Sequence, residues 1–283
     1  MLNFRNQVTS YCLLPLLLLS AQVYGADGKL IGTAGLSQIE GAGGGGLVPW
    51  ATLSGYDSQD QISASGAVTV VDVDDYRLNG FGLSASFYDR AEVSLAHQRL
   101  DLKSLGGTIR QNIAGFKYRL YGDVVYSDLP QISVGIQHKR LSDNAIANAL
   151  GADDDQGTDF YLAATKVHLG AIGGYNAVWN LTARATKANE MGLLGFGGSQ
   201  NSDYELQVEA SAGILLSRNV VVGVEYRQKP DNLGLGEDDW VDAFISYIPS
   251  KSVSITAATA NLGTIAGAPG QSGFYLSLNA QLW

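Results

Sequence analysis

The sequence predicts an all-β protein, an antiparallel transmembrane β-barrel of about 12 strands. Three observations indicate it: a two-faced carboxyl-terminal strand, the same alternation in many upstream segments, and connections sorted into short and long. The final strand carries its large apolar side chains on one face and ends on an aromatic residue; these positions are Phe274, Leu276, Leu278, Leu282 and Trp283. A membrane barrel needs such a strand, because its last strand must pair with its first and leave no open edge in lipid.

The alternation of apolar and polar side chains recurs through most of the chain. In the segment 203–216, for example, Leu206 and Val208 alternate with Gln207 and Glu209. A period of two residues is typical of a strand with two different faces. Most segments have about the 9–11 residues that a tilted strand needs to cross a bilayer. The predicted strands are 77–88, 90–102, 109–121, 130–141, 158–168, 174–187, 203–216, 218–229, 239–248, 251–262 and 272–283.

The number of strands is constrained, because bacterial single-chain barrels have an even number of them. These eleven segments therefore need at least one more. A strand over residues 48–56 gives twelve, which we favour, and strands over 63–73 and 29–39 as well would give fourteen. The expected organisation is a signal peptide over 1–25, a glycine-rich amino-terminal segment over 26–47 and a barrel over 48–283.

The connections between the predicted strands alternate in length. Tight turns fall near residues 89–90, 217–218 and 249–250, and long polar connections near 142–157, 188–202, 230–238 and 262–272. Outer-membrane barrels combine short periplasmic turns with longer extracellular loops. A soluble barrel with its apolar face inward is the alternative, but it has no reason to sort its connections in this way.

Composition excludes several classes of protein. Charged residues make up 16% of the chain and apolar residues 46%, with a mean hydropathy of +0.03. Beyond the leader, no run approaches 18 consecutive apolar residues, so no transmembrane helix is expected. The formal charge is -9, and loss of Arg5 with the leader would make it about -10. This acidic balance argues against nucleic acid as a partner.

The amino terminus resembles a secretory leader. Arg5 precedes a short apolar run over 13–19, and Val23, Tyr24 and Gly25 are small or tolerated residues at the positions that a signal peptidase reads. We expect cleavage after Gly25 and export to the bacterial outer membrane; an uncleaved membrane anchor is the alternative. The single cysteine, Cys12, would be lost with the leader, leaving no thiol or disulfide in the mature chain.

Charged side chains occur on the polar faces of neighbouring predicted strands. They are Arg184, Glu205, Glu209, Glu225 and Arg227, and we expect them to face the barrel lumen. Such residues can neutralise one another in a plugged interior or line a small polar pore. A barrel of about twelve strands is compatible with either arrangement.

The glycine-rich segment contains four consecutive glycines, Gly43, Gly44, Gly45 and Gly46. Its spacing formally satisfies G-x-G-x-x-G, but Pro49 and a β-rich stretch follow where a nucleotide fingerprint needs a helix. A segment that enters the lumen as a plug or gate is the functional interpretation. A plain flexible connection is the alternative.

This stretch also carries a resemblance to a known family. Residues 32–36, 39–41, 43–46 and 47–50 are similar to an uncharacterised family of Gram-negative outer-membrane proteins, known only as a domain of unknown function. The resemblance extends over the whole mature chain and implies an outer-membrane barrel, with no substrate or catalytic residue to transfer. The final strand resembles the signal read by the barrel-assembly machinery, although Trp283 is out of phase with the apolar positions before it.

Catalytic and metal-binding patterns are weak. The three histidines, His97, His138 and His168, lie in no H-E-x-x-H spacing, and G-x-S-x-G is absent from the sequence. Acidic runs at 153–155 and 237–239 lack the spacing of a calcium loop, so we interpret them as solvated loops that could bridge to lipopolysaccharide through divalent cations. We therefore expect no enzyme activity, no bound metal and no cofactor.

Architecture suggests a function class but no solute. We expect a porin-like channel for passive diffusion or uptake of small solutes, in contact with outer-membrane lipid and lipopolysaccharide. A plugged structural or lipopolysaccharide-interacting barrel is the alternative, and an outer-membrane lipid-modifying enzyme is a further one. The sequence does not indicate an oligomeric state.

Overall fold

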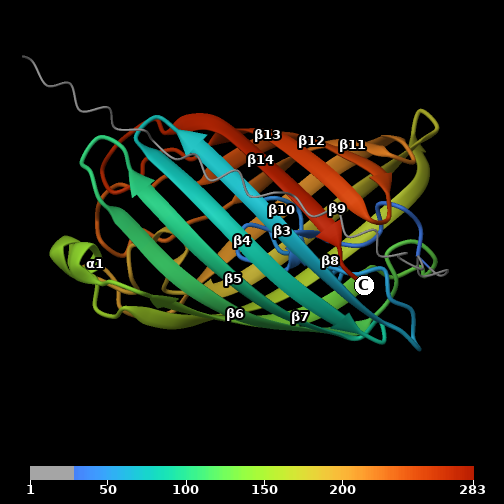
Figure 1. Cartoon of the computed structure of the whole chain (residues 1–283), viewed down its shortest axis with the longest axis horizontal. Coiled ribbons are helices and arrows are strands. Elements are labelled where there is room, and N and C mark those ends of the chain that lie inside the picture. The colour runs from blue at the N-terminus through green and yellow to red at the C-terminus, as the bar shows by residue number, and fades with distance from the viewer. Residues whose placement is uncertain (1–28) are drawn as a thin grey trace, which may run out of the picture.

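The protein is a closed antiparallel β-barrel of twelve strands, seen in a computed structural model that describes residues 29–283 (Figure 1). The predicted leader and its cleavage site lie outside the described residues. The wall consists of β3 (Ile62–Val73), β4 (Tyr76–Phe87), β5 (Ala91–Leu102), β6 (Thr108–Tyr121), β7 (Gln131–Leu141), β8 (Gln156–Ile172), β9 (Tyr175–Thr186), β10 (Glu205–Ser217), β11 (Val220–Arg227), β12 (Trp240–Ser250), β13 (Val253–Asn261) and β14 (Ser272–Gln281).

Each strand of the wall pairs with its sequence neighbours, and the last strand closes the barrel on the first. The β14–β3 ladder runs from Gly273 opposite Val73 to Gln281 opposite Ser65. This pairing leaves no free strand edge in the wall, as a lipid environment requires. The predicted fold class and the count of twelve are therefore confirmed.

The identity of the first wall strand differs from the prediction. The wall begins with β3, whereas residues 48–56, predicted as the twelfth strand, lie inside the barrel. Their burial explains the difference, because residues 51–57 are buried at every position and so have no face for lipid. Pro49 also lacks the N–H that a strand within a closed ladder must donate.

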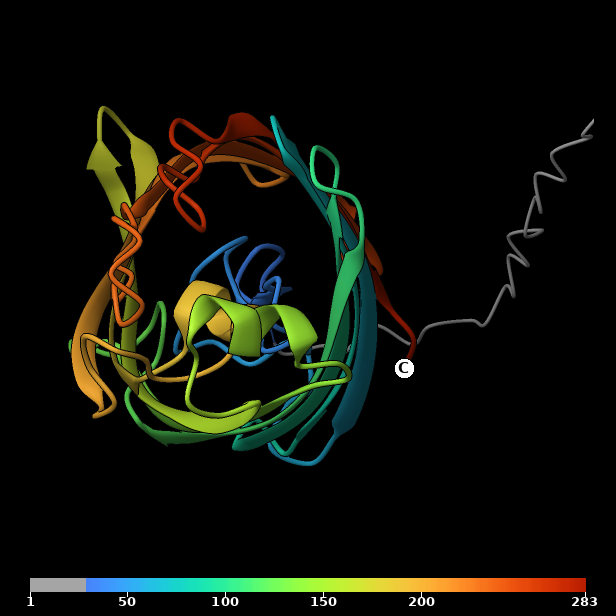
Figure 2. The same cartoon turned by 90° about the vertical axis from the view of Figure 1, so that its left-hand side faces the viewer.

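The amino-terminal part of the chain fills the barrel from within, and we call residues 29–57 the luminal segment (Figure 2). It contains only a minimal sheet, β1 (Leu36–Ser37) paired with β2 (Gly43–Gly44). Both of its ends lie at the turn between β4 and β5: Lys29 pairs with Asp89 at 2.8 Å, and the Asp89 N–H donates to Asp57 at 2.7 Å. The segment therefore enters and leaves the barrel at the same end.

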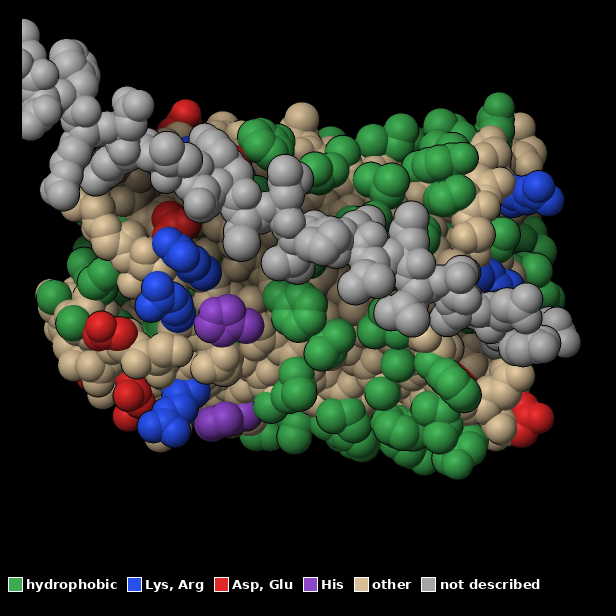
Figure 3. Space-filling view, in the orientation of Figure 1, with side chains coloured by type: hydrophobic (Ala, Val, Ile, Leu, Met, Phe, Trp, Pro, Cys, Tyr) green, Lys and Arg blue, Asp and Glu red, His purple; other side chains and the backbone are tan. Residues whose placement is uncertain are grey.

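The wall is apolar outside and polar inside. In β6, Lys117 is only 1% exposed toward the lumen, whereas its outward neighbours Phe116 and Tyr118 are 44% and 42% exposed. Apolar side chains cover much of the outer surface (Figure 3). Exposed apolar surface of this extent would be unfavourable in water and is favourable against lipid, so it identifies a membrane barrel.

The two ends of the barrel differ, although less strictly than predicted. At the end that holds the chain terminus, most connections are tight, such as 173–174 and 218–219; we call it the turn end. The opposite loop end carries long connections that include α1 (Ala145–Leu150) and η1 (Asn189–Gly192). Two exceptions break the predicted alternation: residues 122–130 form a long connection at the turn end, and residues 74–75 a tight one at the loop end. Within residues 29–283, no helix is long and apolar enough to span a bilayer.

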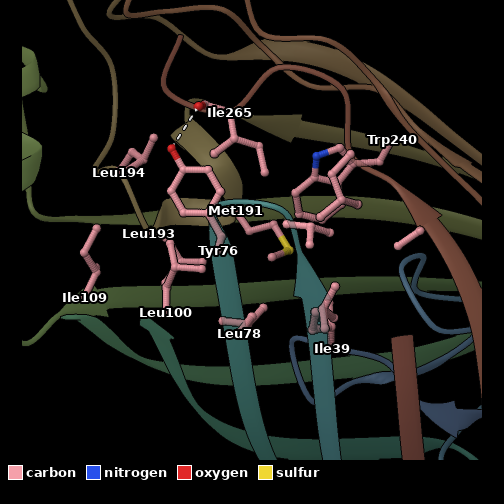
Figure 4. Close-up of a cluster of buried hydrophobic side chains, with 14 of the residues drawn as sticks. Ile39, Tyr76, Leu78, Leu100, Ile109, Met191, Leu193, Leu194, Trp240 and Ile265 are labelled. Atoms are coloured by element: carbon pink, nitrogen blue, oxygen red, sulfur yellow. Dashed lines mark hydrogen bonds between the residues drawn. The ribbon is translucent and has the colours of Figure 1, made fainter. Parts of the chain in front are cut away.

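A hydrophobic core lies just inside the loop end, where many of its members are at the ends of wall strands, and Figure 4 shows part of it. Residues 188–198, which we call the mouth loop, are buried throughout. Its Met191 and Leu193 share one cluster with Leu100 of the wall and with Ile39 at the tip of the luminal segment. The Tyr76 hydroxyl donates to the carbonyl of Ile265 at 3.1 Å in the same region. The luminal segment and the mouth loop therefore pack against each other.

The orientation of the wall predicts which leucines tolerate charge. Leu276 lies at the centre of β14 with 48% of its surface exposed on the outer face. Leu276→Arg should destabilise the membrane-inserted barrel by about 2–4 kcal/mol, the cost of a charge near the bilayer midplane. Urea titration of the protein folded into lipid vesicles measures this cost. Leu105→Arg, at a position 84% exposed in the β5–β6 connection, is the control and should be neutral; equal costs at both positions would contradict the assigned lipid face.

Candidate functional site

Six charged side chains meet inside the lumen, in the half nearer the loop end, and we call them the luminal ion-pair cluster. Five come from consecutive wall strands, β7 to β11, and one from the luminal segment. All are at most 4% exposed. The members are Glu40, Lys139, Asp159, Arg184, Glu209 and Arg227.

Glu40 is the member that links the luminal segment to the wall. Its carboxylate receives a hydrogen bond from Lys139, lies 2.8 Å from the Arg227 guanidinium and 3.4 Å from that of Arg184. It is the sole charged residue between positions 30 and 56. Three cations of the wall therefore converge on one carboxylate of the segment.

The wall members of the cluster also pair with one another. Asp159 lies 2.6 Å from Lys139 and 3.1 Å from Arg184. Glu209 lies 2.7 Å from Arg184 and 3.3 Å from Arg227. Three carboxylates thus balance three cations when Glu40 is in place. Without Glu40, the same wall would hold three cations against two carboxylates.

Charge balance governs the energetics of this burial. Burial alone would raise the pKa of Glu40, but the charges of Arg227, Lys139 and Arg184 outweigh it and hold that pKa well below its usual value. Glu40 is therefore ionised at neutral pH. Removal of one partner from a buried ion pair is strongly destabilising, because it leaves the other charges uncompensated.

Two further carboxylates of the wall bind the backbone of the luminal segment. Glu225 accepts hydrogen bonds from the N–H groups of Gly46 and Leu47, both at 2.7 Å. Glu92 accepts from the N–H groups of Gly43 at 2.9 Å and Ser54 at 2.7 Å. These bonds satisfy backbone donors that have no strand partner and would otherwise be costly to bury.

The four glycines are explained by this close approach. A Cβ atom at Gly45 would collide with the Glu225 carboxylate, and one at Gly43 would lie 2.7 Å from the backbone nitrogen of Ser54. Neither glycine has a positive φ angle, so space rather than backbone conformation requires them. The structure therefore places the glycine run inside the lumen, against the wall, rather than in a free connection.

Neutral side chains of the wall complete the polar contacts. They bond to carbonyl and N–H groups of the luminal segment from several sides of the barrel. The pairs are Gln98 with the Ile39 carbonyl, Asn279 with the Ser37 N–H, Thr165 with the Ala51 N–H, Thr182 with the Pro49 carbonyl and Ser133 with the Ala51 carbonyl. The wall thus substitutes for the strand partners that the irregular segment lacks.

The predicted lumen-facing residues divide into two groups. The structure brings Arg184, Glu209 and Arg227 into one cluster and places Glu225 beside the glycine run. Glu205 does not join them: it lies at the loop end of β10 and accepts a hydrogen bond from Asn201 at 2.8 Å.

The sequence analysis did not identify three of the six cluster members, which are Glu40, Lys139 and Asp159. It also did not identify the neighbouring pair of Glu92 and Lys117. Lys117 and Lys139 occupy the polar face of alternating segments, so the same pattern that identified Arg184 applied to them. Glu40 had a different signal, as the lone charge in a long neutral stretch.

The predicted assembly residues lie on or near the lipid face of the closing strand. Phe274, Leu276, Leu278 and Leu282 are between 40% and 52% exposed, and Trp283 is 77% exposed beyond the end of β14. The Trp283 carbonyl accepts a hydrogen bond from Ala64 of β3 at 3.1 Å. Recognition of this strand by the barrel-assembly machinery stays a prediction.

The candidate catalytic and metal residues are separate from the cluster. His97, His138 and His168 pair with Asn112, Thr158 and Trp179, respectively. In the acidic runs, Asp154 pairs with Lys187 at 2.9 Å, and Asp238 accepts a hydrogen bond from Thr264 at 2.6 Å. Residues 29–283 contain no group of three or more side chains suited to holding a metal ion.

The mouth loop contains a second buried carboxylate. Glu190 is 4% exposed and pairs with Lys229, which also lies 3.0 Å from Glu237. Both Glu190 and Met191 have positive φ angles, a strained conformation for residues other than glycine. Burial raises the pKa of Glu190 well above its usual value; Lys229 opposes this effect and Glu237 adds to it.

Substitution of Glu40 tests the ion-pair cluster. Glu40→Gln should weaken docking of the luminal segment by about 3–5 kcal/mol, because Lys139, Arg184 and Arg227 lose their shared carboxylate. Protease cleavage within the segment, followed during urea titration in lipid vesicles, measures the docking. Asp60→Asn is the matched control, since Asp60 is exposed and bonds only to the nearby Ser58. Equal protection in both variants would contradict the role of Glu40.

The pH response of the mouth loop follows from Glu190. A carboxyl group with a raised pKa binds its proton more tightly in the folded protein, so loop docking should weaken as the pH rises above the ordinary value of 4.5 and through the raised pKa. Hydrogen exchange of residues 188–198 at several pH values measures this slope. Glu190→Gln should flatten it; an unchanged slope in that variant would assign the response to another group.

Comparison with known proteins gives a family and related folds. No curated protein matches the chain. Similar solved structures include the KdgM porin in complex with disordered oligogalacturonate (TM-score 0.48, 11% identity, 76% of this chain and 98% of that chain) and Omp33 from Acinetobacter baumannii (0.44, 11%, 78% and 96%). Outer membrane phospholipase A from Escherichia coli is also similar (0.36, 9%, 79% and 92%). The model of DUF3034, a family described as a protein of unknown function, matches residues 33–279, and the chain belongs to that family.

Proposed function

We propose that this protein is an outer-membrane channel for small polar solutes, gated by its own luminal segment. One observation carries the proposal: the segment occupies the lumen through polar contacts, and both of its ends leave at the turn end. Lys29 and Asp57 both contact Asp89 there. A segment anchored in this way can withdraw from the lumen without threading through the wall. The turn end faces the periplasm in outer-membrane barrels, so the segment would withdraw toward the periplasm.

The chemistry of the interface supports a reversible gate. Buried carboxylates and amides of the wall bond to the backbone of the segment, and water can take over each of these bonds after withdrawal. An apolar interface would instead expose a large hydrophobic surface. The vacated wall would be polar and of mixed charge, with Lys117, Lys139 and Arg184 near Glu92 and Asp159. Such a lining suits hydrophilic solutes.

The remaining parts of the proposal concern the surroundings of the barrel. Outer-membrane lipid would contact the apolar outer face, and the assembly machinery would act on β14 during insertion. We propose a channel rather than an enzyme, because the buried carboxylates Glu40, Glu92 and Glu225 are used in contacts that hold the luminal segment. Transport would depend on opening alone.

A structural, permanently plugged barrel is the second candidate, and one observation favours it. The mouth loop closes the loop end with an apolar cluster that includes Ile39, Leu47 and Val48 of the luminal segment. An opening event must therefore release these contacts as well as the ion pairs. The two candidates differ in whether the segment leaves the lumen at all.

A disulfide lock tests the gate. A Cβ atom added at Gly82 of β4 would lie 3.2 Å from the Ser37 hydroxyl oxygen in β1, within reach of a disulfide. Ser37→Cys with Gly82→Cys should abolish single-channel conductance in a planar bilayer when oxidised, and a reducing agent should restore the openings of the parent protein. The chain without residues 29–57 should conduct continuously.

The outcomes separate the candidates. Conductance that persists in the oxidised variant would show that solutes pass without movement of the luminal segment. A folded, heat-modifiable barrel that lacks residues 29–57 and carries no current would favour the structural role. The single-cysteine variants, Ser37→Cys and Gly82→Cys, control for the substitutions themselves.

A further inference from the structure

We propose that the outer face of β5, β6 and β7 binds the phosphate groups of a phosphorylated glycolipid in the outer leaflet, namely lipopolysaccharide. This inference depends on the membrane position of the barrel and not on the gate. The face carries three arginines in one row near the loop end, Arg99, Arg110 and Arg140, one on each strand. All three are exposed on the side opposite the lumen.

The register places these like charges next to one another. Arg99 lies directly opposite Arg110 in the β5–β6 ladder, and Arg140 lies opposite Asn112, diagonal to Arg110. Diagonal neighbours in an antiparallel ladder are about 7–8 Å apart, and like charges directly opposite are destabilising. An anionic partner would turn this repulsion into attraction.

The protein itself supplies little compensation. Asp101 pairs with Arg99 at 2.9 Å and also attracts Arg110 electrostatically, whereas residues 29–283 contain no ion pair at contact distance to Arg110 or Arg140. Arg77 and Lys103, on the neighbouring part of the surface, both pair with Asp72. The row therefore keeps an excess of positive charge on a chain whose formal charge is -9.

The rows beneath the arginines match the rest of such a lipid. Two residues further toward the turn end lie His97, Asn112 and His138, whose polar groups can bond to sugar hydroxyls. The next row is apolar, with Leu95 58% and Ile136 43% exposed. Successive rows are separated by about 7 Å along the strands. Basic and histidine side chains lie together on this part of the surface, directly beside the apolar belt (Figure 3).

This order is cationic, then polar, then apolar, from the outer rim toward the membrane centre. A phosphorylated sugar headgroup above acyl chains has the complementary order. Loop ends of outer-membrane barrels face the cell exterior, so the row lies in the leaflet that holds lipopolysaccharide. Guanidinium groups form bidentate, charge-assisted bonds with phosphate, which explains the use of arginine rather than lysine in all three positions.

Binding of diphosphorylated lipid A to the mature protein in detergent, followed by native mass spectrometry, tests the inference. Arg99→Gln with Arg110→Gln and Arg140→Gln should lower the affinity by about tenfold or more, the scale of a lost charge-assisted bond. Arg140→Gln alone should give part of that loss. Arg90→Gln with Arg218→Gln, at exposed sites of the turn end, is the control and should bind as the parent does.

The lipid is varied in a parallel series. The parent protein should bind dephosphorylated lipid A and phosphatidylglycerol at least about tenfold more weakly than the diphosphorylated form. Equal binding of lipid A with and without phosphate would show that the acyl chains, and not the phosphate groups, provide the binding, and would overturn the proposal. Unchanged affinity in the triple variant, or equal binding of phosphatidylglycerol, would overturn it as well.

Discussion

The buried carboxylate of Glu40 is the interaction on which the interior of this barrel depends. Three cations of the wall converge on it, and with it in place the luminal ion-pair cluster is neutral. If Glu40 leaves the lumen, only two wall carboxylates remain to balance the three cations. A charge-balanced cluster at this point allows an irregular chain segment to lie in a space that a barrel of this size could otherwise leave open.

The rest of the interior follows from the same requirement for partners. The luminal segment has almost no regular structure, so its backbone groups need side chains of the wall in place of strand neighbours. Glu225 and Glu92 fill this role at the glycine run, where only glycine leaves room for a carboxylate against the backbone. The mouth loop closes the other end by apolar packing, which includes the tip of the segment. Polar anchoring and apolar packing thus act on the same element, with Glu40 of the ion-pair cluster directly beside Ile39 of the apolar cluster.

The sequence predicted the wall well because lipid imposes a simple pattern on it. Each strand must alternate, and β14 must close on β3, so periodicity alone located eleven of the twelve strands. The interior obeys no such rule. The β-rich residues 48–56 are predicted as a strand, yet residues 51–57 are buried at every position inside the wall. Glu40 and its partners are far apart in the chain, so only the closed barrel brings them together. The alternation of polar and apolar residues was enough to predict that Arg184, Glu209 and Arg227 face the lumen.

Hydrogen exchange of the protein in a lipid bilayer measures most directly whether the luminal segment occupies the lumen through these contacts. The amides of Gly43, Gly46, Leu47 and Ser54 donate to buried carboxylates and should exchange far more slowly than those of an unstructured peptide. Glu40→Gln should accelerate all four together. Exchange at the rate of a free peptide in the parent protein would contradict the account, because the segment would then lie outside the barrel or move freely within it.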